Sequence, residues 1–237
     1  MNGKTILITG AGRGLGRATA IALSKLGARL ILLARTAEQL QQTQSMLHSQ
    51  DAILIPTDIS SAVQVQEMAN QLSNSVGQID VLVNNAAGWY QGGLHDIDPV
   101  NLGDLISTTI TGTILITKYL MPLLEKGSSP HIVNIVSIAG LPCRNMDPST
   151  SSTAYHAAKF GQAGFSESLR AEVKDKGIRV STLYPGAFAS DSTLDDTDAD
   201  IISRYGMGVM GVRDVVESIL FTLSRSSVAT IQSLVIA

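Results

Sequence analysis

A tyrosine and a lysine four residues apart, preceded by a serine, form a set of side chains that could transfer a proton. Tyr155 and Lys159 occur in the segment AYHAAK, and Ser137 lies upstream in IVSIAG. Residues with this spacing share one face of a helix, one turn apart. An ammonium at that distance favours the phenolate, so we expect Lys159 to lower the pKa of Tyr155 from its ordinary value of about 10. Such a phenol could exchange a proton with an alcohol oxygen.

A glycine-rich segment near the start of the chain indicates a phosphate site. TGAGRGLG at 9–16 follows the apolar run 5–8, and the residues after it have helical periodicity. Glycines at a strand-to-helix turn let the backbone approach a pyrophosphate at the helix N-terminus. The spacing is GxxxGxG rather than the commoner GxGxxG, and an ordinary glycine-rich turn is the alternative. The residues expected to contact a dinucleotide here are Gly10, Gly12, Arg13, Gly14, Leu15 and Gly16.

With both motifs present, the chain resembles the short-chain dehydrogenase/reductase family in its single-domain branch. Further family signatures follow in order, namely Asp58 in PTDIS, NNAA at 84–87 and YPG at 184–186. The resemblance covers nearly the whole of 1–237. It implies a single Rossmann-like domain with a doubly wound parallel sheet, and hydride exchange between a nicotinamide cofactor and a small-molecule alcohol or carbonyl substrate.

The resemblance also implies roles for the three side chains described first. Tyr155 would be the acid in reduction and the base in oxidation. Lys159 would hold the nicotinamide ribose, and Ser137 would stabilise the charge that develops on the substrate oxygen. Taken singly, Ser137 is more typical of a hydroxyl at the end of a strand, and Tyr155 of a half-buried core aromatic.

The end of the second expected strand favours NADP(H) over NAD. An acid there would bind the ribose 2′-hydroxyl and repel a 2′-phosphate. Here Ala34 is followed by Arg35 and Thr36, and a guanidinium can bind a phosphate through two parallel hydrogen bonds. Arg13 offers a second cation. Both arginines have the alternative of being solvated surface residues.

Other cofactor contacts rest on the family resemblance. Asp58 alone is also typical of a helix N-terminal cap, and Trp89 and Tyr90 either border the pocket or pack inside the fold. Ala87 stands where the family usually has a glycine. The resemblance assigns further contacts to Asp58, Ile59, Asn84, Ala86, Tyr155, Lys159, Pro185, Gly186 and Phe188.

Composition suits an α/β protein and argues against several other classes. The 237 residues are 44% hydrophobic and 16% charged, as expected for parallel strands buried on both faces. The net charge of −3 and the lack of a basic stripe argue against nucleic acid. The single Cys143, the absence of a long apolar stretch and the absence of a signal-peptide pattern predict a cytoplasmic protein without a membrane span. No metal site is expected, because the histidines are scattered and 196–207 lacks the glycine and glutamate of a calcium loop.

Strand-like and helix-like patterns alternate along the chain, which predicts a doubly wound parallel sheet. Strands are expected at 5–9, 29–34, 52–56, 80–84, 131–136, 178–184 and 230–236. Helices are expected at 14–26, 36–48, 62–76, 99–125, 153–175 and 212–224. Two irregular stretches, 137–153 and 186–200, follow strands and are expected to form the walls of a substrate pocket.

Two features depart from the family pattern. Thr109 stands where the family has an asparagine that holds a water behind the lysine, and Ser137 and Tyr155 are separated by extra residues within 138–153. We expect the longer loop to affect substrate access more than chemistry.

The leading hypothesis is an NADPH-dependent carbonyl reductase, or the reverse alcohol dehydrogenase, acting on a small or medium apolar substrate. One alternative is a 3-oxoacyl thioester reductase, with Arg144, Arg204 and Arg213 as cations for a carrier protein. Another is an NADP(H)-binding sensor without turnover, suggested by Thr109. Family relatives pair through helices equivalent to 99–125 and 153–175, which implies a homodimer or homotetramer.

Overall fold

The computed structural model describes residues 1–142 and 152–237. Most of the expected pocket wall at 137–153, namely 143–151 with Cys143 and Arg144, lies outside these residues. The strands are β1 (Thr5–Thr9), β2 (Arg29–Ala34), β3 (Ile53–Pro56), β4 (Val81–Asn84), β5 (His131–Ile135), β6 (Arg179–Pro185), β7 (Phe188–Ala189), β8 (Met210–Gly211) and β9 (Ser233–Ile236). The helices are α1 (Gly14–Lys25), α2 (Ala37–Ser45), α3 (Ala62–Ser75), α4 (Pro99–Ile106), α5 (Gly112–Leu124), α6 (Thr153–Glu172), α7 (Asp198–Tyr205) and α8 (Val212–Leu223), with short π or 3₁₀ turns η1 (Ser107–Thr111), η2 (Ile138–Gly140) and η3 (Lys174–Lys176).

Seven strands form one parallel sheet in the order β3-β2-β1-β4-β5-β6-β9. The order reverses direction between β1 and β4, where β1 pairs with both β2 and β4. In open α/β sheets, ligands bind outside the carboxyl ends of the strands at such a switch point. This is the Rossmann-like sheet that the alternating pattern predicts, and each of its seven expected strands is present within two or three residues at either end.

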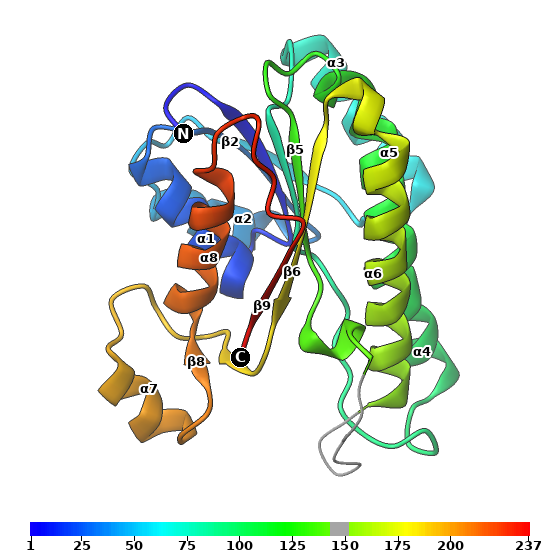
Figure 1. The fold of residues 1–237 in the computed structure, drawn as a ribbon, viewed down its shortest axis with the longest axis vertical. Helices are drawn as coiled ribbons and strands as arrows, with labels where there is room; N and C mark the ends of the chain where they lie inside the picture. The colour runs from blue at the N-terminus through cyan, green and yellow to red at the C-terminus, as the bar shows by residue number, and fades with distance from the viewer. Residues whose placement is uncertain (143–151) are drawn as a thin grey trace.

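Helices cover both faces of the sheet, so its strands are apolar on both sides (Figure 1). Ile6 and Ile8 of β1 pack with residues of α1 and α8 on one face. Leu7, between them, packs with residues of α3 and α5 on the other. Side chains alternate between the faces of a strand, so one short apolar run contributes to two cores. No helix of the described residues is long and apolar enough to cross a membrane.

The helix expected at 99–125 is interrupted by a π turn. The chain runs from α4 through η1 at Ser107–Thr111 into α5, and Thr109 is fully buried within that turn. A π turn inserts one extra residue into a helix and often occurs at functional sites. The apolar periodicity continues through it, so the sequence pattern predicts a single long helix there.

The stretch expected to be irregular at 186–200 is partly regular. Phe188–Ala189 pairs with Met210–Gly211 as a two-stranded parallel sheet, and α7 begins at Asp198. Thr197 caps α7 in a reciprocal capping box with Asp200. The acidic residues of this segment are therefore helix-capping and ion-pairing groups, since Asp196 also pairs with Arg204 at 2.5 Å.

Candidate active site

Ser137 and Tyr155 come together at the carboxyl end of β5. Ser137 caps η2, accepting a hydrogen bond from the Ala139 backbone N–H at 3.1 Å. Ser152 caps α6 in the same way, accepting from the Tyr155 N–H at 3.3 Å. The two turns pack closely at Gly140, where an added Cβ would lie 2.9 Å from the Lys159 carbonyl oxygen. Two capped turns thus hold the serine and the tyrosine helix against each other.

Lys159 lies in the interior, with its side chain only 2% exposed. Its Nζ donates to the Ile135 carbonyl oxygen at 3.1 Å and to Gln162 Oε1 at 2.9 Å. The same nitrogen is 5.8 Å from the centre of the Tyr155 ring. The lysine thus approaches the tyrosine from the protein side, as the four-residue spacing predicts.

The expected lowering of the Tyr155 pKa is not what the site produces. Burial raises the pKa of Tyr155, and a hydrogen bond with Ser137 only partly offsets this. Burial also lowers the pKa of Lys159, to about 7. Removal from water penalises both charged forms, so the phenolate is disfavoured and the lysine is only partly protonated near neutral pH. The tyrosine is therefore held as a neutral phenol, which is the form that donates a proton.

Aromatic side chains surround the tyrosine. The ring of Trp89 meets that of Tyr155 edge to face, with centroids 4.7 Å apart, and the indole is 70% exposed. The ring of His156 also meets that of Tyr155 edge to face, with centroids 6.5 Å apart, and its Nδ1 lies 2.9 Å from the Ser152 carbonyl oxygen. The exposed indole therefore presents an apolar surface beside Tyr155, whereas Tyr90 packs partly buried against Leu105 and Ala154.

The glycine-rich turn has the geometry that phosphate binding needs. Gly10 and Gly14 have φ of +67° and +54°, in the left-handed region that favours glycine. A Cβ at Gly16 would lie 2.3 Å from the Gly10 carbonyl oxygen. Helix α1 begins at Gly14, directly after this turn, so its free N–H groups are available to an anion. The residues present therefore fit a dinucleotide pyrophosphate.

Two polar residues that we did not predict fasten this turn to the loop after β4. Thr9 Oγ1 accepts hydrogen bonds from the backbone N–H groups of Asn85 and Ala86, both at 3.0 Å. Asn85 Nδ2 donates to the carbonyl oxygens of Thr9 at 2.9 Å and Gly10 at 3.3 Å. Thr9 is the first residue of the segment TGAGRGLG. Its hydroxyl at the end of a buried strand was the feature of the sequence that could have predicted this role.

Asn84, predicted as a cofactor contact, directs its side chain into the protein. It is fully buried, and its Nδ2 donates to Thr117 Oγ1 at 3.1 Å and Asn134 Oδ1 at 2.9 Å. Ile59 is likewise buried in the core, 5% exposed. Asp58 accepts from the Ser60 N–H and hydroxyl, at 2.9 and 2.7 Å, and Ser61 rather than Asp58 caps α3.

Two exposed cations lie near the end of β2, one directly after the strand and one in the glycine turn. Arg35 and Thr36 directly follow the strand and are exposed, as is Arg13 in the glycine turn. Within residues 1–142 and 152–237, neither arginine forms an ion pair. Gly12 approaches the same region, since its added Cβ would lie 3.2 Å from Cβ of Ala34. The strand end and the glycine turn are therefore neighbours, with unneutralised positive charge on both.

The segment after β6 closes the other side of the glycine turn. Pro185 ends the strand, the Gly186 N–H donates to the Ile236 carbonyl oxygen at 2.6 Å, and Phe188 packs partly buried against the core. The carbonyl oxygen of Ser190 lies 3.3 Å from where a Cβ on Gly14 would be. The chain thus brings its predicted contacts at 185–188 beside the glycine turn.

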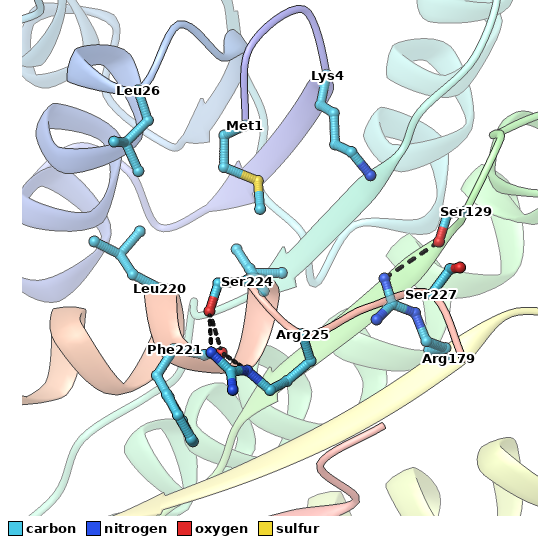
Figure 2. Close-up of a pocket in the computed structure, with 11 residues that line it drawn as sticks. Met1, Lys4, Leu26, Ser129, Arg179, Leu220, Phe221, Ser224, Arg225 and Ser227 are labelled. Atoms are coloured by element: carbon cyan, nitrogen blue, oxygen red, sulfur yellow. Dashed lines mark hydrogen bonds between the residues drawn. The ribbon is translucent and has the colours of Figure 1, made fainter. Parts of the chain in front are cut away.

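A cavity of about 590 Å³ lies at the edge of the sheet where the strands begin, opposite the edge that carries the predicted site residues (Figure 2). Its lining includes Lys4 before β1, Ser129 before β5 and Arg179 at the start of β6. Arg179 donates to Ser129 Oγ at 3.3 Å, and Arg225 donates to the Phe221 carbonyl oxygen at 3.1 Å. None of the predicted site residues lines this cavity, and Arg179 fastens the neighbouring loops to the sheet.

Comparison with known proteins agrees with this arrangement. The family model described as short chain dehydrogenase matches residues 4–200. The chain is 31% identical to 3-oxoacyl-[acyl-carrier-protein] reductase of Haemophilus influenzae over 228 residues, covering 94% of this chain and 92% of that protein. It is 27% identical to an uncharacterised oxidoreductase of Staphylococcus aureus, over 94% of this chain and 91% of that one.

A solved structure extends the comparison to the fold. A metagenomic short-chain oxidoreductase in complex with NADP superposes with a TM-score of 0.81, at 27% identity, over 99% of this chain and 96% of that one. The predicted motifs, the sheet order and these likenesses lead to one assignment. The chain belongs to the short-chain dehydrogenase/reductase family and is an NAD(P)-dependent oxidoreductase that acts on alcohol or carbonyl groups.

Proposed function

We propose that the protein is an NADPH-dependent carbonyl reductase in which Tyr155 donates the proton. The observation that carries this proposal is the neutral, half-buried phenol of Tyr155 between Ser137 and Lys159 at the carboxyl end of β5. At neutral pH the phenol carries the proton that reduction requires, whereas oxidation requires the phenolate, which burial disfavours.

The three side chains divide the work as charge develops on the substrate oxygen. When bound, NADPH supplies the hydride that reaches the carbonyl carbon. The Ser137 hydroxyl donates a hydrogen bond to the oxygen as it becomes negative. Tyr155 gives that oxygen its proton, and the ammonium of Lys159 stabilises the phenolate that remains. Trp89 shields the reacting oxygen from water on the exposed side.

The unpaired cations Arg13 and Arg35 support NADPH over NADH. Neither guanidinium pairs with a carboxylate of the described residues. The 2′-phosphate of NADPH would supply the negatively charged partner. We expect Arg35→Ala to weaken NADPH binding about 10-fold or more, the cost of a charge-assisted hydrogen bond, and to leave NADH binding unchanged. Fluorescence titration with both cofactors measures this directly, and equal losses for the two would contradict the assignment of Arg35.

The experiment that tests the function is a survey of NADPH oxidation, with NADH in parallel, against ketones, aldehydes and 3-oxoacyl thioesters. The proposal expects turnover with at least one simple carbonyl compound, faster with NADPH. The likeness to a 3-oxoacyl-[acyl-carrier-protein] reductase makes thioesters an informative arm of the survey. Activity confined to thioesters would replace the broad carbonyl assignment, and NADPH binding without any turnover would replace it with a sensor.

A further inference from the structure

We infer that Gln162 is a positioning residue that holds the Lys159 ammonium in place and connects it to the loop after β4. This inference rests on the proposed function for its catalytic consequence, but its structural part stands on contacts alone. Gln162 lies three residues after Lys159 on α6, which places both on one face of that helix.

The first contact is direct. Lys159 Nζ donates to two acceptors within the described residues, the Ile135 carbonyl oxygen and Gln162 Oε1, and the amide oxygen is the nearer at 2.9 Å. Both side chains are buried, 2% and 1% exposed. Among the described residues no carboxylate pairs with Lys159. The amide dipole of Gln162 is therefore the side-chain group that stabilises the buried charge.

The contact continues as a chain that donates in one direction from Lys159 to the Thr109 carbonyl oxygen, and a separate bond, donated the other way by the Gly88 N–H, joins the Thr109 hydroxyl to the loop. Gln162 Nε2 donates to Thr113 Oγ1 at 3.2 Å, and Thr113 Oγ1 donates to the Thr109 carbonyl oxygen at 2.8 Å. Thr109 Oγ1 in turn accepts from the Gly88 N–H at 3.0 Å. Hydrogen bonds in such a series polarise one another, which strengthens the series as a whole.

The π turn puts this chain within reach of the loop. Thr109 lies inside η1, and Thr113 follows it by four residues in α5, so the two meet along one side of the continuous helix. Gly88 is the residue before Trp89, the indole that contacts Tyr155. The series therefore begins at the lysine and ends beside the residue that covers the tyrosine.

This arrangement answers the question raised by Thr109. The Thr109 hydroxyl accepts from the Gly88 N–H, whereas Gln162 lies on α6, the same helix as Lys159. Gln162 supplies the acceptor to Lys159, while Thr109 supplies the attachment for the loop. The amide also orients the lysine without adding a charge that would neutralise it.

The test follows the titration of Lys159 by NMR in protein labelled with ¹³C-lysine, without cofactor, in three variants. In Gln162→Glu a carboxylate takes the place of the amide oxygen, and we expect the pKa of Lys159 to rise by about 1 or more. In Gln162→Met the acceptor is gone at similar length, and we expect it to fall below the wild-type value. Thr113→Val removes only the second bond, and we expect a smaller fall. The same pKa in all four proteins would overturn the inference.

Ser166→Ala is the matched control. Ser166 is fully buried on the same face of α6 and donates to the Gln162 backbone carbonyl oxygen at 2.7 Å, but it does not contact Lys159. We expect it to lower the melting temperature and leave the Lys159 titration unchanged. A Lys159 shift in this control equal to that of Gln162→Met would assign the effect to general loosening of the helix and overturn the inference. If Gln162→Met does not fold, Gln162→Glu and Thr113→Val carry the test.

Turnover gives the second readout. We expect Gln162→Met to lower kcat for NADPH-dependent reduction roughly 10- to 100-fold, the cost of misplacing a group by about 1 Å. We expect Gln162→Glu to recover much of that loss with a pH profile displaced to higher pH. Wild-type protein that does not turn over while its Lys159 responds to Gln162 would refute the proposed function and leave the positioning role standing. Turnover unaffected by either variant would refute the catalytic role of Gln162.

Discussion

The parallel strands all begin at one edge of the sheet, the amino edge, and end at the other, the carboxyl edge. Both edges bury polar and charged side chains, but the surroundings of those side chains differ. At the amino edge, the Asp80 carboxylate accepts from the Thr5 N–H and from Gln78, both at 2.9 Å, and His131 Nε2 lies 2.8 Å from Ser181 Oγ. At the carboxyl edge, Lys159 is buried just as deeply, yet it lies beneath a tyrosine that reaches the surface next to an exposed indole.

The comparison shows that burial of a polar group does not identify a functional site. His131 has its pKa lowered to about 3 by burial, and then by Arg179 and Lys4, a change about as large as that at Lys159. The affected histidine is fully enclosed and cannot meet a substrate. The carboxyl edge, which we propose to be catalytic, differs because its perturbed groups lie next to an exposed side chain, and the same edge carries a glycine turn that fits a phosphate.

The largest effect should come from the carboxyl edge. Tyr155→Phe removes the hydroxyl and keeps the ring against Trp89, so we expect kcat to fall about 10²- to 10⁴-fold with little change in melting temperature. NADPH titration should give nearly the wild-type Kd. The matched change at the amino edge, His131→Asn, should leave kcat close to wild type. Comparable losses of kcat in the two variants would erase the distinction between the edges.

The glycine turn offers the next effect in size. Gly16→Ala places a Cβ against a backbone oxygen at 2.3 Å, and we expect it to cost about 2 kcal/mol of unfolding free energy and to weaken NADPH binding strongly. Gly103→Ala in α4 is the control, because nothing lies within 4 Å of its Cβ. We expect that change to stabilise the protein by about 0.5–1 kcal/mol, as measured by urea unfolding. A tolerated Gly16→Ala with normal binding would contradict the close approach.

The amino edge should govern stability against acid. The folded protein keeps His131 neutral down to pH of about 3, whereas the unfolded chain protonates it below about 6.5. The unfolded state therefore binds more protons between these values, and stability is lost as the pH falls from 6.5 towards 3. Between about pH 7 and about pH 5.5 we expect this residue to account for a loss of about 1 kcal/mol.

Urea unfolding at the two pH values, in wild type and His131→Asn, isolates that contribution. The variant should lose about 1 kcal/mol less than wild type over the interval. An identical pH dependence in both proteins would show that another group controls acid stability.

The smallest effect belongs to a solvent-exposed ion pair on the surface. Lys176 and Glu125 pair at 2.5 Å, but their side chains are 48% and 41% exposed. Water and salt screen such a pair, so we expect Glu125→Gln to change the unfolding free energy by less than about 0.5 kcal/mol. A loss several times larger in urea unfolding would mean that a solvated pair contributes as much as the buried groups.

Much of the fold was predictable because strong local patterns determine it. The apolar run ending at Thr9 and the glycines after it predict β1, the turn and α1, and the structure has all three. The pattern could not reveal the π turn at Thr109, because its neighbours remain apolar with helical spacing. Helix α7 was missed although its capping box, Thr197 with Asp200, stands in the sequence, because the acidic residues around it suggested a solvated loop.

The site was predictable in position more than in electrostatics. The spacing of Tyr155 and Lys159 predicts their proximity, but the sign of the Tyr155 pKa shift depends on how deeply the ring is buried. Sequence spacing carries no such information. The side chain of Asn84 illustrates the same limit, since a strand residue faces either the ligand or the core according to register and neighbours.

The most direct test of the central claim is isotope transfer from NADPH that carries deuterium at C4 of the nicotinamide, with each C4 epimer used in turn. Incubation with the carbonyl substrates found above, followed by mass spectrometry of the alcohol, shows where the label goes. The account predicts deuterium on the carbinol carbon from one epimer, and about 10²-fold or more slower labelling by Tyr155→Phe. NADPH that binds but gives no labelled alcohol with any carbonyl compound, or labelling that proceeds equally fast in Tyr155→Phe, would contradict it.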